Sequence, residues 1–357
     1  MPKIINVESE IPPIQITQEK AVGFAKSLFS SSFKDIDRLL PIFTHSDITT
    51  RYFVKDIDWF SKEHSFEEKN NLFIENSVEL GKNCIEKIIQ QTEGLNYGDI
   101  DAIITICTSG IATPTIEARI MNLLPFSPYV KRIPIWGLGC AGGAAGLARA
   151  QDYCVAYPKA NVLVLTIELC SLTFQVNDRS KSNLVGTALF ADGVACALVS
   201  GDKSAVLVHQ NRVLPSIIGT QSILKKDSLD VMGWDIRNEG MFVVFSKNIP
   251  SLVQSWLRPN VDHFLQQYEI TLNDVSNFVV HPGGKKVLDA YKVSLNVTDE
   301  QLFLARKVLK DFGNMSSATV LYVLKEHFKK SIQNGEYGLA LALGPGFASE
   351  LLLMRWE

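Results

Sequence analysis

The sequence lacks several features that would place it in a specialised class of protein. Its net charge is only −3, so we do not expect a nucleic-acid partner. No segment approaches the roughly 18 consecutive apolar residues of a membrane-spanning helix. The first residues also lack the charged and then apolar segments of a signal peptide. We therefore expect a cytoplasmic protein with no membrane span.

The cysteines show neither a CxxC pair nor any other spacing typical of metal ligands. In a chain of this size, such cysteines are expected to be reduced thiols in a cytosolic protein, without a metal site. There are six of them, at Cys84, Cys107, Cys140, Cys154, Cys170 and Cys196.

The chain has 357 residues, of which 46% are hydrophobic, enough for a large core. Predicted helices alternate with short apolar strands, a pattern that favours an α/β layered fold with strands buried on both faces. The longest helical patterns cover residues 17–43, 66–95 and 249–268. A further helix is predicted over 285–292, with Pro282 in its first turn.

Cys140 lies in the most distinctive segment, which runs from residue 133 to 157. The pattern predicts a strand, a sharp turn that carries Cys140, and a buried helix rich in glycine and alanine. Each glycine costs a helix about 1 kcal/mol relative to alanine, so close packing of neighbouring backbones is the expected compensation. A thiol at a helix N-terminus has a lowered pKa, which favours a nucleophile. The alternative is a small core cysteine.

Two further residues complete a candidate catalytic set. His281 ends an apolar strand, where α/β proteins present catalytic side chains. The other five histidines (His45, His64, His209, His263 and His327) are predicted to lie on the surface. Asn314 begins a helix, either as an N-cap or as an amide that stabilises an oxyanion. A Cys-His-Asn set also occurs in papain-like proteases, but their sequence around the cysteine is absent here.

Glu168 ends the apolar strand 161–168 and is interpreted either as a buried polar anchor or as part of a water network. There is also a weak internal repeat, because residues 139–144 resemble residues 313–318. We therefore divide the chain into two similar α/β halves, 1–205 and 206–357. No Gly/Ser-rich linker separates them, so they are expected to pack as one body.

Five motifs, in order along nearly the whole chain, resemble the type III polyketide synthase (chalcone synthase-like) family. They are WGLGCAGGAAGLARA, SNLVGTALFADG, VVHPGGKKVLDA, FGNMSSATVLYVL and ALGPGF. Within that family, WGLGCAGGA, IELCSLTF and DVMGWD are most similar to the Bacillus alkylpyrone synthases. The resemblance implies a thiolase-like fold of five layers, α-β-α-β-α, and a homodimer. It also implies acyl-CoA and malonyl-CoA as substrates, with no further cofactor.

The resemblance assigns roles residue by residue. Cys140, His281 and Asn314 match the nucleophile, the histidine and the asparagine of the family. Phe190 matches the first gatekeeper between CoA tunnel and cavity, and the second falls at Val243 or one residue from it. Cavity-lining or scaffold roles are implied for a larger set: Thr108, Thr173, Gly186, Gly344, Pro345 and Gly346. Thr113 matches a residue that reaches into the partner's cavity.

One part of the family pattern matches poorly. Of three cations that grip the CoA phosphates in plant enzymes, the sequence keeps only Arg38, while Pro41 and His45 replace the others. Lys285, Lys286 or Arg51 are candidates to compensate. The alternative is that a carrier protein donates the starter.

The predicted activity is iterative condensation. A fatty acyl-CoA starter, expected to be long, is loaded on Cys140 and extended with malonyl-CoA, and alkylpyrone-type tri- or tetraketides are released. One alternative is a single condensation, as in β-ketoacyl-carrier-protein synthase III, whose usual HQAN and GNTSAA patterns are replaced here by HPGG and GNMSSA. A second alternative is a lipid-binding thiolase-fold protein without catalysis.

Overall fold

Two groups of strands form the framework of the protein. The computed structural model describes residues 1–30, 33 and 35–357. Nine strands follow the order β11-β12-β13-β8-β1-β7-β6-β4-β5. The last five strands in this order come from the first 200 residues, and the first four come from residues 215–356. In the described chain, one residue pair, Lys3 with Ser216, joins the two groups where β1 meets β8.

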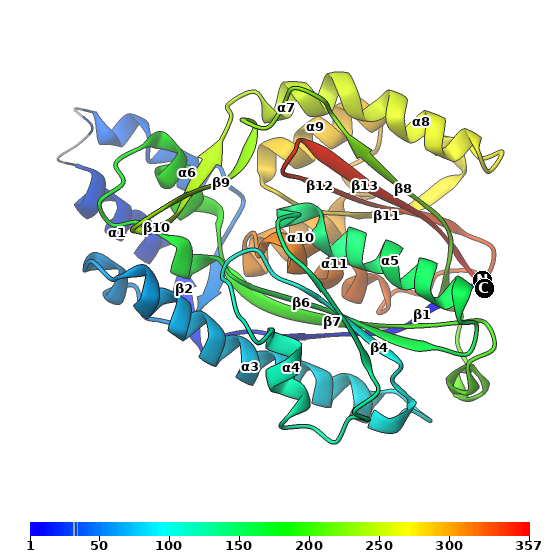
Figure 1. Ribbon diagram of the computed structural model, residues 1–357. Helices are drawn as coiled ribbons and strands as arrows, with labels where there is room; N and C mark the ends of the chain where they lie inside the picture. The colour runs from blue at the N-terminus through cyan, green and yellow to red at the C-terminus, as the bar shows by residue number, and fades with distance from the viewer. Residues whose placement is uncertain (31–32, 34) are drawn as a thin grey trace.

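The strands and helices stack in the five layers that the resemblance implies (Figure 1). Helices α3 and α4 cover the outer face of the first sheet, and α8 and α9 lie over the second. Helices α5 and α11 fill the middle layer, and each contacts strands of both sheets. Strands β6 and β7 are buried along their whole length, as expected for strands covered on both faces.

The strand bounds follow the chain order. They are β1 Lys3–Glu10, β2 Ile14–Thr17, β3 Thr50–Phe53, β4 Ala102–Ile106, β5 Lys131–Ile135, β6 Asn161–Leu169, β7 Asp192–Ser200, β8 Pro215–Leu224, β9 Met232–Arg237, β10 Gly240–Phe245, β11 Val275–Val280, β12 Tyr337–Gly344 and β13 Ala348–Trp356. Strands β9 and β10 form a separate hairpin, and β2 and β3 pair as a second two-stranded sheet, with α1 and α2 between them in the chain.

The helices also follow the chain order. They are α1 Gln18–Phe29, α2 Pro41–Thr44, α3 Phe66–Gln91, α4 Ile116–Met121, α5 Gly142–Ala156, α6 Lys181–Leu189, α7 Ile249–Leu252, α8 Arg258–Gln266, α9 Lys285–Leu295, α10 Phe303–Phe312 and α11 Thr319–His327. In the described part of the chain, no helix is long and apolar enough to cross a membrane.

Three predicted helices differ from the structure. The helix over 17–43 is wrong as one element: α1 ends at Phe29, and Pro41, which lacks an N–H, begins the separate helix α2. The helix over 249–268 contains a π-helical segment, Val253–Leu257, directly before Pro259, which has no N–H for the Ser255 carbonyl. The third helix, α9, begins at Lys285, so Pro282 precedes it rather than opening it.

Close backbone approach explains the small residues of α5. A Cβ atom added at Gly143 would lie 2.3 Å from the carbonyl oxygen of Ser317, and one at Gly142 would lie 3.2 Å from the Cβ of Ser317. On another side of the helix, a Cβ at Gly146 would lie 2.7 Å from Ile106 and Val164. The predicted compensation for the glycines is therefore confirmed: α5 packs backbone to backbone against the turn that begins α11.

The two middle helices begin alike, which shows the internal repeat in space. A 3₁₀ turn precedes each, Gly139–Ala141 before α5 and Ser316–Ala318 before α11, and its first residue has a positive φ, +48° at Gly139 and +46° at Ser316. In this register Cys140 corresponds to Ser317. The repeat predicted from sequence, which aligns residues 139–144 with 313–318 and so Cys140 with Asn314, is therefore three residues out of register.

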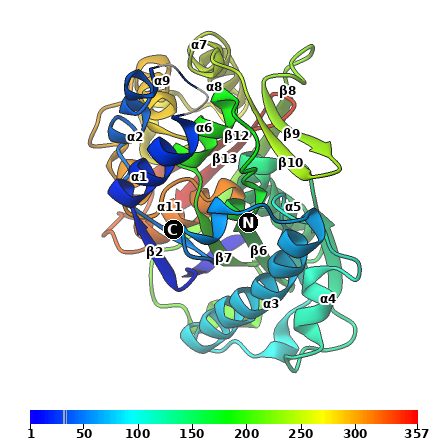
Figure 2. The same ribbon diagram turned by 90° about the vertical axis from the view of Figure 1, so that its left-hand side faces the viewer.

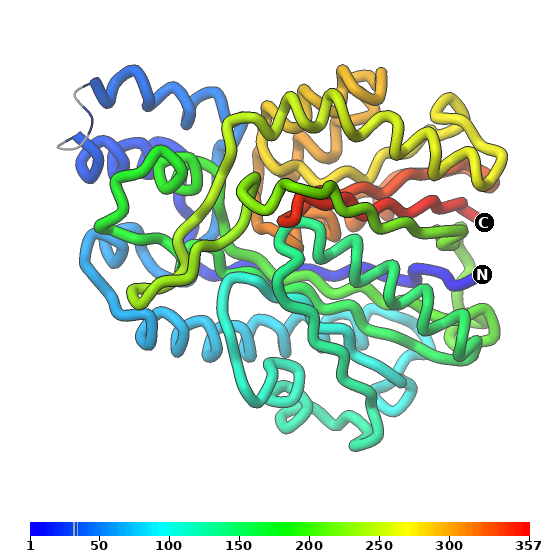
Figure 3. Tube along the Cα trace, turned by 45° about the horizontal axis from the view of Figure 1, so that its top comes forward, coloured from blue at the N-terminus to red at the C-terminus, as the bar shows by residue number. Residues whose placement is uncertain are grey.

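The elements outside the two sheets gather at one end of the molecule. Helices α1, α2 and α6 and the hairpin β9–β10 lie together there, as Figure 2 shows from that side. Both chain termini lie at the opposite end (Figure 3). This gathering of elements forms the walls of the pocket described below.

We expect Gly143→Ala to lower the free energy of unfolding by about 2 to 3 kcal/mol, because the new methyl group has no space between α5 and Ser317. Urea denaturation would measure the loss. Gly23 in α1 is the matched control: a Cβ there meets nothing within 4 Å, so Gly23→Ala should stabilise the protein by up to about 1 kcal/mol. Equal stability of Gly143→Ala and wild type would contradict the packing argument.

Candidate active site

Cys140 lies in the turn between β5 and α5, and two segments hold this turn. The Gly139 N–H donates to Thr108 Oγ1 at 3.2 Å. A Cβ at Gly139 would lie 2.7 Å from Pro345, and a Cβ at Gly344 would lie 2.7 Å from the Cβ of Ala141. The loop 344–346 therefore packs directly against the cysteine turn, and both glycines permit the contact. Cys140 itself is half-buried.

Asn314 is fixed through both its backbone and its side chain. Its N–H donates to the Leu189 carbonyl and its carbonyl accepts from the Ala191 N–H, both at 2.9 Å, so it pairs with Phe190. The side-chain Oδ1 accepts from the Ser316 N–H at 2.9 Å, and Nδ2 donates to the Gly283 carbonyl at 3.0 Å. The oxygen thus makes the local turn expected of a capping residue, while the amide retains a second N–H for a ligand.

His281 directly follows β11, as predicted, and is almost fully buried. Its backbone N–H donates to the Leu341 carbonyl at 2.8 Å. In the described part of the protein, neither ring nitrogen has a hydrogen-bond partner. Gly283 lies beside the ring, since a Cβ there would be 3.6 Å from Nε2. The ring is thus buried with both nitrogens available, an arrangement typical of functional sites.

A chain of contacts brings the three residues to one place. The Cys140 thiol donates to Ser316 Oγ at 3.7 Å. Ser316 contacts the Asn314 side chain, Asn314 contacts Gly283, and Gly283 lies against the His281 ring. The set therefore combines a sulfur from the first half with a ring and an amide from the second.

Burial controls the protonation of this site. It raises the pKa of the Cys140 thiol, although hydrogen bonds from Ser316 and Asn314 lower it, and it lowers the pKa of the His281 ring. The prediction that the helix N-terminus yields a low thiol pKa is therefore wrong for the unliganded site, because desolvation of the charged sulfur outweighs it. Transfer of the thiol proton to His281 would create two charges that stabilise each other.

Glu168 is a buried anchor between the halves. Its Oε2 accepts from the Thr108 N–H, the Ser109 N–H and the Ser109 hydroxyl, and its Oε1 accepts from Ser317 at 2.6 Å. These are the contacts expected of the anchor interpretation. Because Thr108 accepts a hydrogen bond from the Gly139 N–H, the Glu168 carboxylate stabilises the cysteine turn through Thr108.

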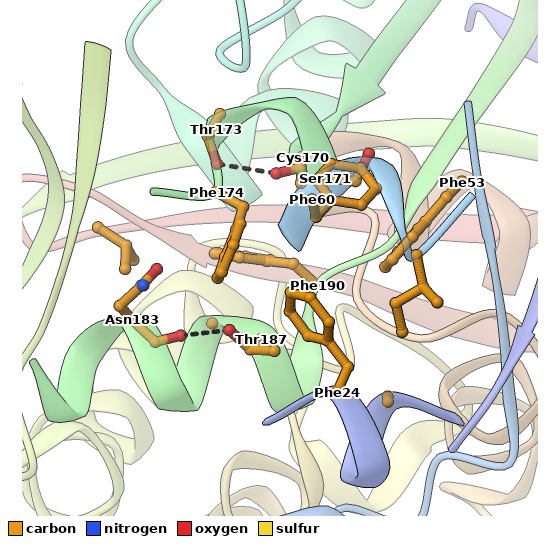
Figure 4. Close-up of a pocket in the computed structure, with 14 residues that line it drawn as sticks. Phe24, Phe53, Phe60, Cys170, Ser171, Thr173, Phe174, Asn183, Thr187 and Phe190 are labelled. Atoms are coloured by element: carbon orange, nitrogen blue, oxygen red, sulfur yellow. Dashed lines mark hydrogen bonds between the residues drawn. The ribbon is translucent and has the colours of Figure 1, made fainter. Parts of the chain in front are cut away.

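Five phenylalanine rings contribute to the lining of a pocket (Figure 4). The pocket adjoins the set because Phe190, in its lining, pairs with Asn314. Phe190, Thr173, Gly186 and Val243, all predicted cavity or gate residues, line it. The rest of its lining is Ala21, Phe24, Phe53, Ile57, Phe60, Cys170, Ser171, Phe174, Asn183 and Thr187. Burial raises the pKa of Cys170 in this lining, and the charges of Glu168, Asp192 and Cys140 raise it further.

The gate around Phe190 has more members than the sequence suggested. A Cβ at Gly186 would lie 3.4 Å from the Phe190 ring and 3.5 Å from Val243. The Phe190 ring also contacts Phe245 and Trp234, with centroids 5.5 and 5.9 Å away. Val243 and Phe245 point to the same face of β10, where residues two apart share a face.

Several predicted residues lie away from the catalytic set. Thr113 is exposed. The Arg38 side chain is 86% exposed and pairs with Asp35 at 2.6 Å. Lys285 pairs with Asp289 at 3.2 Å and Asp47 at 3.6 Å. The two proposed CoA cations thus already have carboxylate partners.

Two expectations about basic residues are wrong. Arg51 cannot grip CoA phosphates, because it is fully buried and donates to the carbonyls of Thr187, Ala188 and Phe190 at the end of α6. His327 is not on the surface: it is buried, and its Nδ1 lies 2.9 Å from the Val323 carbonyl. In both cases backbone carbonyls lie within hydrogen-bond distance of buried side-chain nitrogens, which offsets part of the cost of burying them.

Comparisons with known proteins match both halves of the chain. Residues 48–203 match the family described as chalcone and stilbene synthases, N-terminal domain, and residues 217–356 match the corresponding C-terminal domain. A candidate chalcone synthase of Bacillus subtilis (strain 168) is 50% identical over 99% of this chain and 98% of its own length. The 1,3,6,8-tetrahydroxynaphthalene synthase of Streptomyces peucetius subsp. caesius is 32% identical over 98% of this chain and 92% of its own.

The fold is shared with solved structures. The 1,3,6,8-tetrahydroxynaphthalene synthase of Streptomyces coelicolor A3(2), a bacterial type III polyketide synthase, superposes with a TM-score of 0.93 at 27% identity, over 99% of both chains. A polyketide synthase of the brown alga Ectocarpus siliculosus superposes with a TM-score of 0.91 at 25% identity, over 100% of this chain and 98% of its own.

The proton transfer can be tested by alkylation. We expect iodoacetamide to label Cys140 faster than the other five cysteines, at a rate that rises with pH because the thiolate is the nucleophile. His281→Ala should slow this labelling at pH 7 by about tenfold or more. Without the proton acceptor, the thiolate of Cys140 forms only at higher pH, so the increase in labelling rate moves to higher pH. Cys107, also half-buried, is the internal control and should keep its rate. An unchanged pH profile for Cys140 would show that the ring does not accept the proton.

Proposed function

Since the chain belongs to the chalcone and stilbene synthase family of type III polyketide synthases, which catalyse decarboxylating Claisen condensations, we propose that its starter is a long-chain fatty acyl-CoA. We propose further that its products are alkylpyrones, released as tri- or tetraketides. The observation that carries this proposal is the phenylalanine-lined pocket behind Phe190, which offers an alkyl chain an apolar environment.

In the proposed mechanism, Cys140 loads the starter. The thiol proton passes to His281, the sulfur attacks the acyl thioester carbonyl, and the bond to the CoA sulfur breaks. CoA leaves with a proton, and the acyl group remains on Cys140 as a new thioester. Ser316, which accepts from the Cys140 thiol, and Asn314 keep the sulfur oriented during this exchange.

His281 and Asn314 then act on malonyl-CoA. The imidazole N–H and the free amide N–H donate to its thioester carbonyl. The bond to the malonyl carboxylate breaks, CO₂ leaves, and the electron pair forms an enolate that these donors stabilise. The enolate carbon attacks the Cys140 thioester, and the sulfur leaves as a thiolate. Burial of the site protects the enolate from protonation by water.

The elongated chain is reloaded until it closes. After two or three condensations, an enol oxygen attacks the thioester carbonyl, the carbon–sulfur bond breaks, and the sulfur leaves as a thiol with the enol proton, which gives the lactone ring of an α-pyrone. The pocket around Thr173 and Val243 holds the alkyl tail, because only small side chains stand at these positions beside the rings.

Assembly and substrate delivery are also proposed. Strand β5 is an edge strand whose first two residues are exposed, and Ile111, Leu123 and Trp136 are exposed. A second copy pairing along β5 would form a homodimer in which Thr113 reaches the partner's cavity. We propose that Lys285 and Arg38 leave their carboxylate partners and bind the CoA phosphates instead. The enzyme is proposed to be cytoplasmic. A carrier protein as starter donor is the alternative.

Single substitutions separate the steps. We expect Cys140→Ala to abolish pyrone formation from acyl-CoA and malonyl-CoA, since no thioester can form, while malonyl-CoA decarboxylation continues. Asn314→Ala should reduce decarboxylation by about 100-fold or more, because one enolate donor is lost. Mass spectrometry of products and CO₂ release would measure both.

The same assay tests the proposed products. Pyrone formation by Cys140→Ala would refute the nucleophile, and equal losses of loading and decarboxylation in Asn314→Ala would refute the enolate role. Products from malonyl-CoA alone, with no incorporation of fatty acyl-CoA, would refute the long-chain starter. A single condensation that requires a carrier protein would support the alternative instead.

Substitution of Lys285 tests CoA binding. We expect Lys285→Glu to raise KM for malonyl-CoA several-fold with kcat unchanged, because phosphate contacts are the same in the ground and transition states. The effect should weaken at high salt. Lys310→Glu, which places the same charge change on the exposed end of α10, is the control. An unchanged KM at low salt would indicate that Lys285 does not contact CoA.

A further inference from the structure

Lys69 is a buried lysine that the proposed mechanism does not use. It lies on α3 with only 7% of its surface exposed. Its Nζ donates to the Phe174 carbonyl at 2.9 Å and to Gln175 Oε1 at 2.8 Å. Burial lowers its pKa to about 8, although the charges of Glu63 and Glu68 raise it. An ammonium group is costly to bury, so its two acceptors are expected to be specific.

Gln175 connects this lysine to the walls of the pocket. Its Nε2 donates to the Thr173 carbonyl and to the Met241 carbonyl, each at 3.2 Å. Its backbone carbonyl accepts from Asn183 Nδ2 at 2.8 Å. Thr173, Asn183 and the strand of Met241 each contribute to the pocket lining. The Gln175 side-chain amide therefore contacts two walls of the pocket, its backbone carbonyl contacts the third, and Lys69 donates to the side-chain oxygen.

The hydrogen bond from Gln175 to Met241 anchors the hairpin β9–β10. Among the described residues, it is the one hydrogen bond that joins residues 232–245 to the rest of the chain. The approach is also close, because a Cβ at Gly240 would lie 2.7 Å from Gln175 Nε2. This hairpin carries Val243, which lines the pocket, and Trp234, which contacts the Phe190 ring.

We propose that Lys69 and Gln175 form a positioning pair that determines which acyl starters fit, by holding the hairpin β9–β10 and the Thr173 turn at a fixed separation from α6. The inference rests on the proposed function for the identity of the starter. The pair touches no reacting atom, and its effect reaches the substrate through the position of Val243 and Thr173.

Gln175→Glu is the discriminating variant. It keeps an oxygen for Lys69 but loses both N–H donors, and it places a carboxylate oxygen against the Met241 carbonyl. The hairpin is then released. We expect branched and longer acyl-CoA starters to gain kcat/KM relative to the preferred starter by about fivefold or more, because a looser wall discriminates less between chain shapes. Malonyl-CoA decarboxylation should stay unchanged, since Cys140, His281 and Asn314 are untouched.

Lys69→Met should change the starter profile in the same direction, because Gln175 then lacks the donor that orients it. Lys82→Met is the matched control: Lys82 lies on the same helix, is partly exposed and pairs with Glu86, so its loss should leave the profile unchanged. Thermal unfolding of each variant would show that it is folded. A lowered Tm with the wild-type starter profile would overturn the proposal, because the pair would then be merely structural.

Hydrogen exchange followed by mass spectrometry gives a second readout that does not depend on the substrate. In Gln175→Glu, amides of residues 232–245 should exchange faster than in wild type, while those of β6 and β7 keep their protection. Unchanged exchange in the hairpin would overturn the proposal. If wild-type enzyme makes no product from any acyl-CoA but the hairpin is released as expected, the proposed starter fails and the positioning role stands.

Discussion

The close approach of α5 to the turn before α11 is the constraint on which the rest of the structure depends. Gly143 lies so near the Ser317 carbonyl that no side chain fits between them. This contact fixes the distance between the starts of two helices, one with Cys140 before it and the other with Asn314 before it. Catalytic geometry is set here by backbone packing, which is far stiffer than a contact between long side chains.

Polar groups reinforce this packed junction. Glu168 accepts hydrogen bonds from Ser109 of the first half and from Ser317 of the second, inside a region closed to water. Burial raises its pKa to about 6, while the four donors favour the charged form. The carboxylate therefore favours one arrangement of the halves, because any other would leave it unpaired. The proposed proton transfer between Cys140 and His281 relies on the same exclusion of water.

The sequence predicted the catalytic set better than the pocket, for a physical reason. Cys140, His281 and Asn314 each lie at the end of a strand or the start of a helix, and such ends converge in a layered α/β fold. The pocket rings come from α1, β3, the segment before α3, and the two segments that flank α6. Nothing in the local sequence around Phe24 or Phe60 indicates that they meet. The small residues of α5 did predict close packing, but their exact partner, Ser317, required coordinates. The prediction that Arg51 binds CoA failed because its sequence neighbours are polar and do not indicate that carbonyls at the end of α6 surround the guanidinium.

The placement of the chain ends has a practical consequence. Met1 pairs with Asp202, and the Glu357 N–H donates to the Leu214 carbonyl, so both ends are held at the side of the molecule remote from the pocket. An affinity tag, a surface tether or a second enzyme fused at either end would extend away from the phenylalanine rings. The protein could thus be immobilised or joined to an upstream acyl-activating enzyme while the mouth of its pocket stays unobstructed.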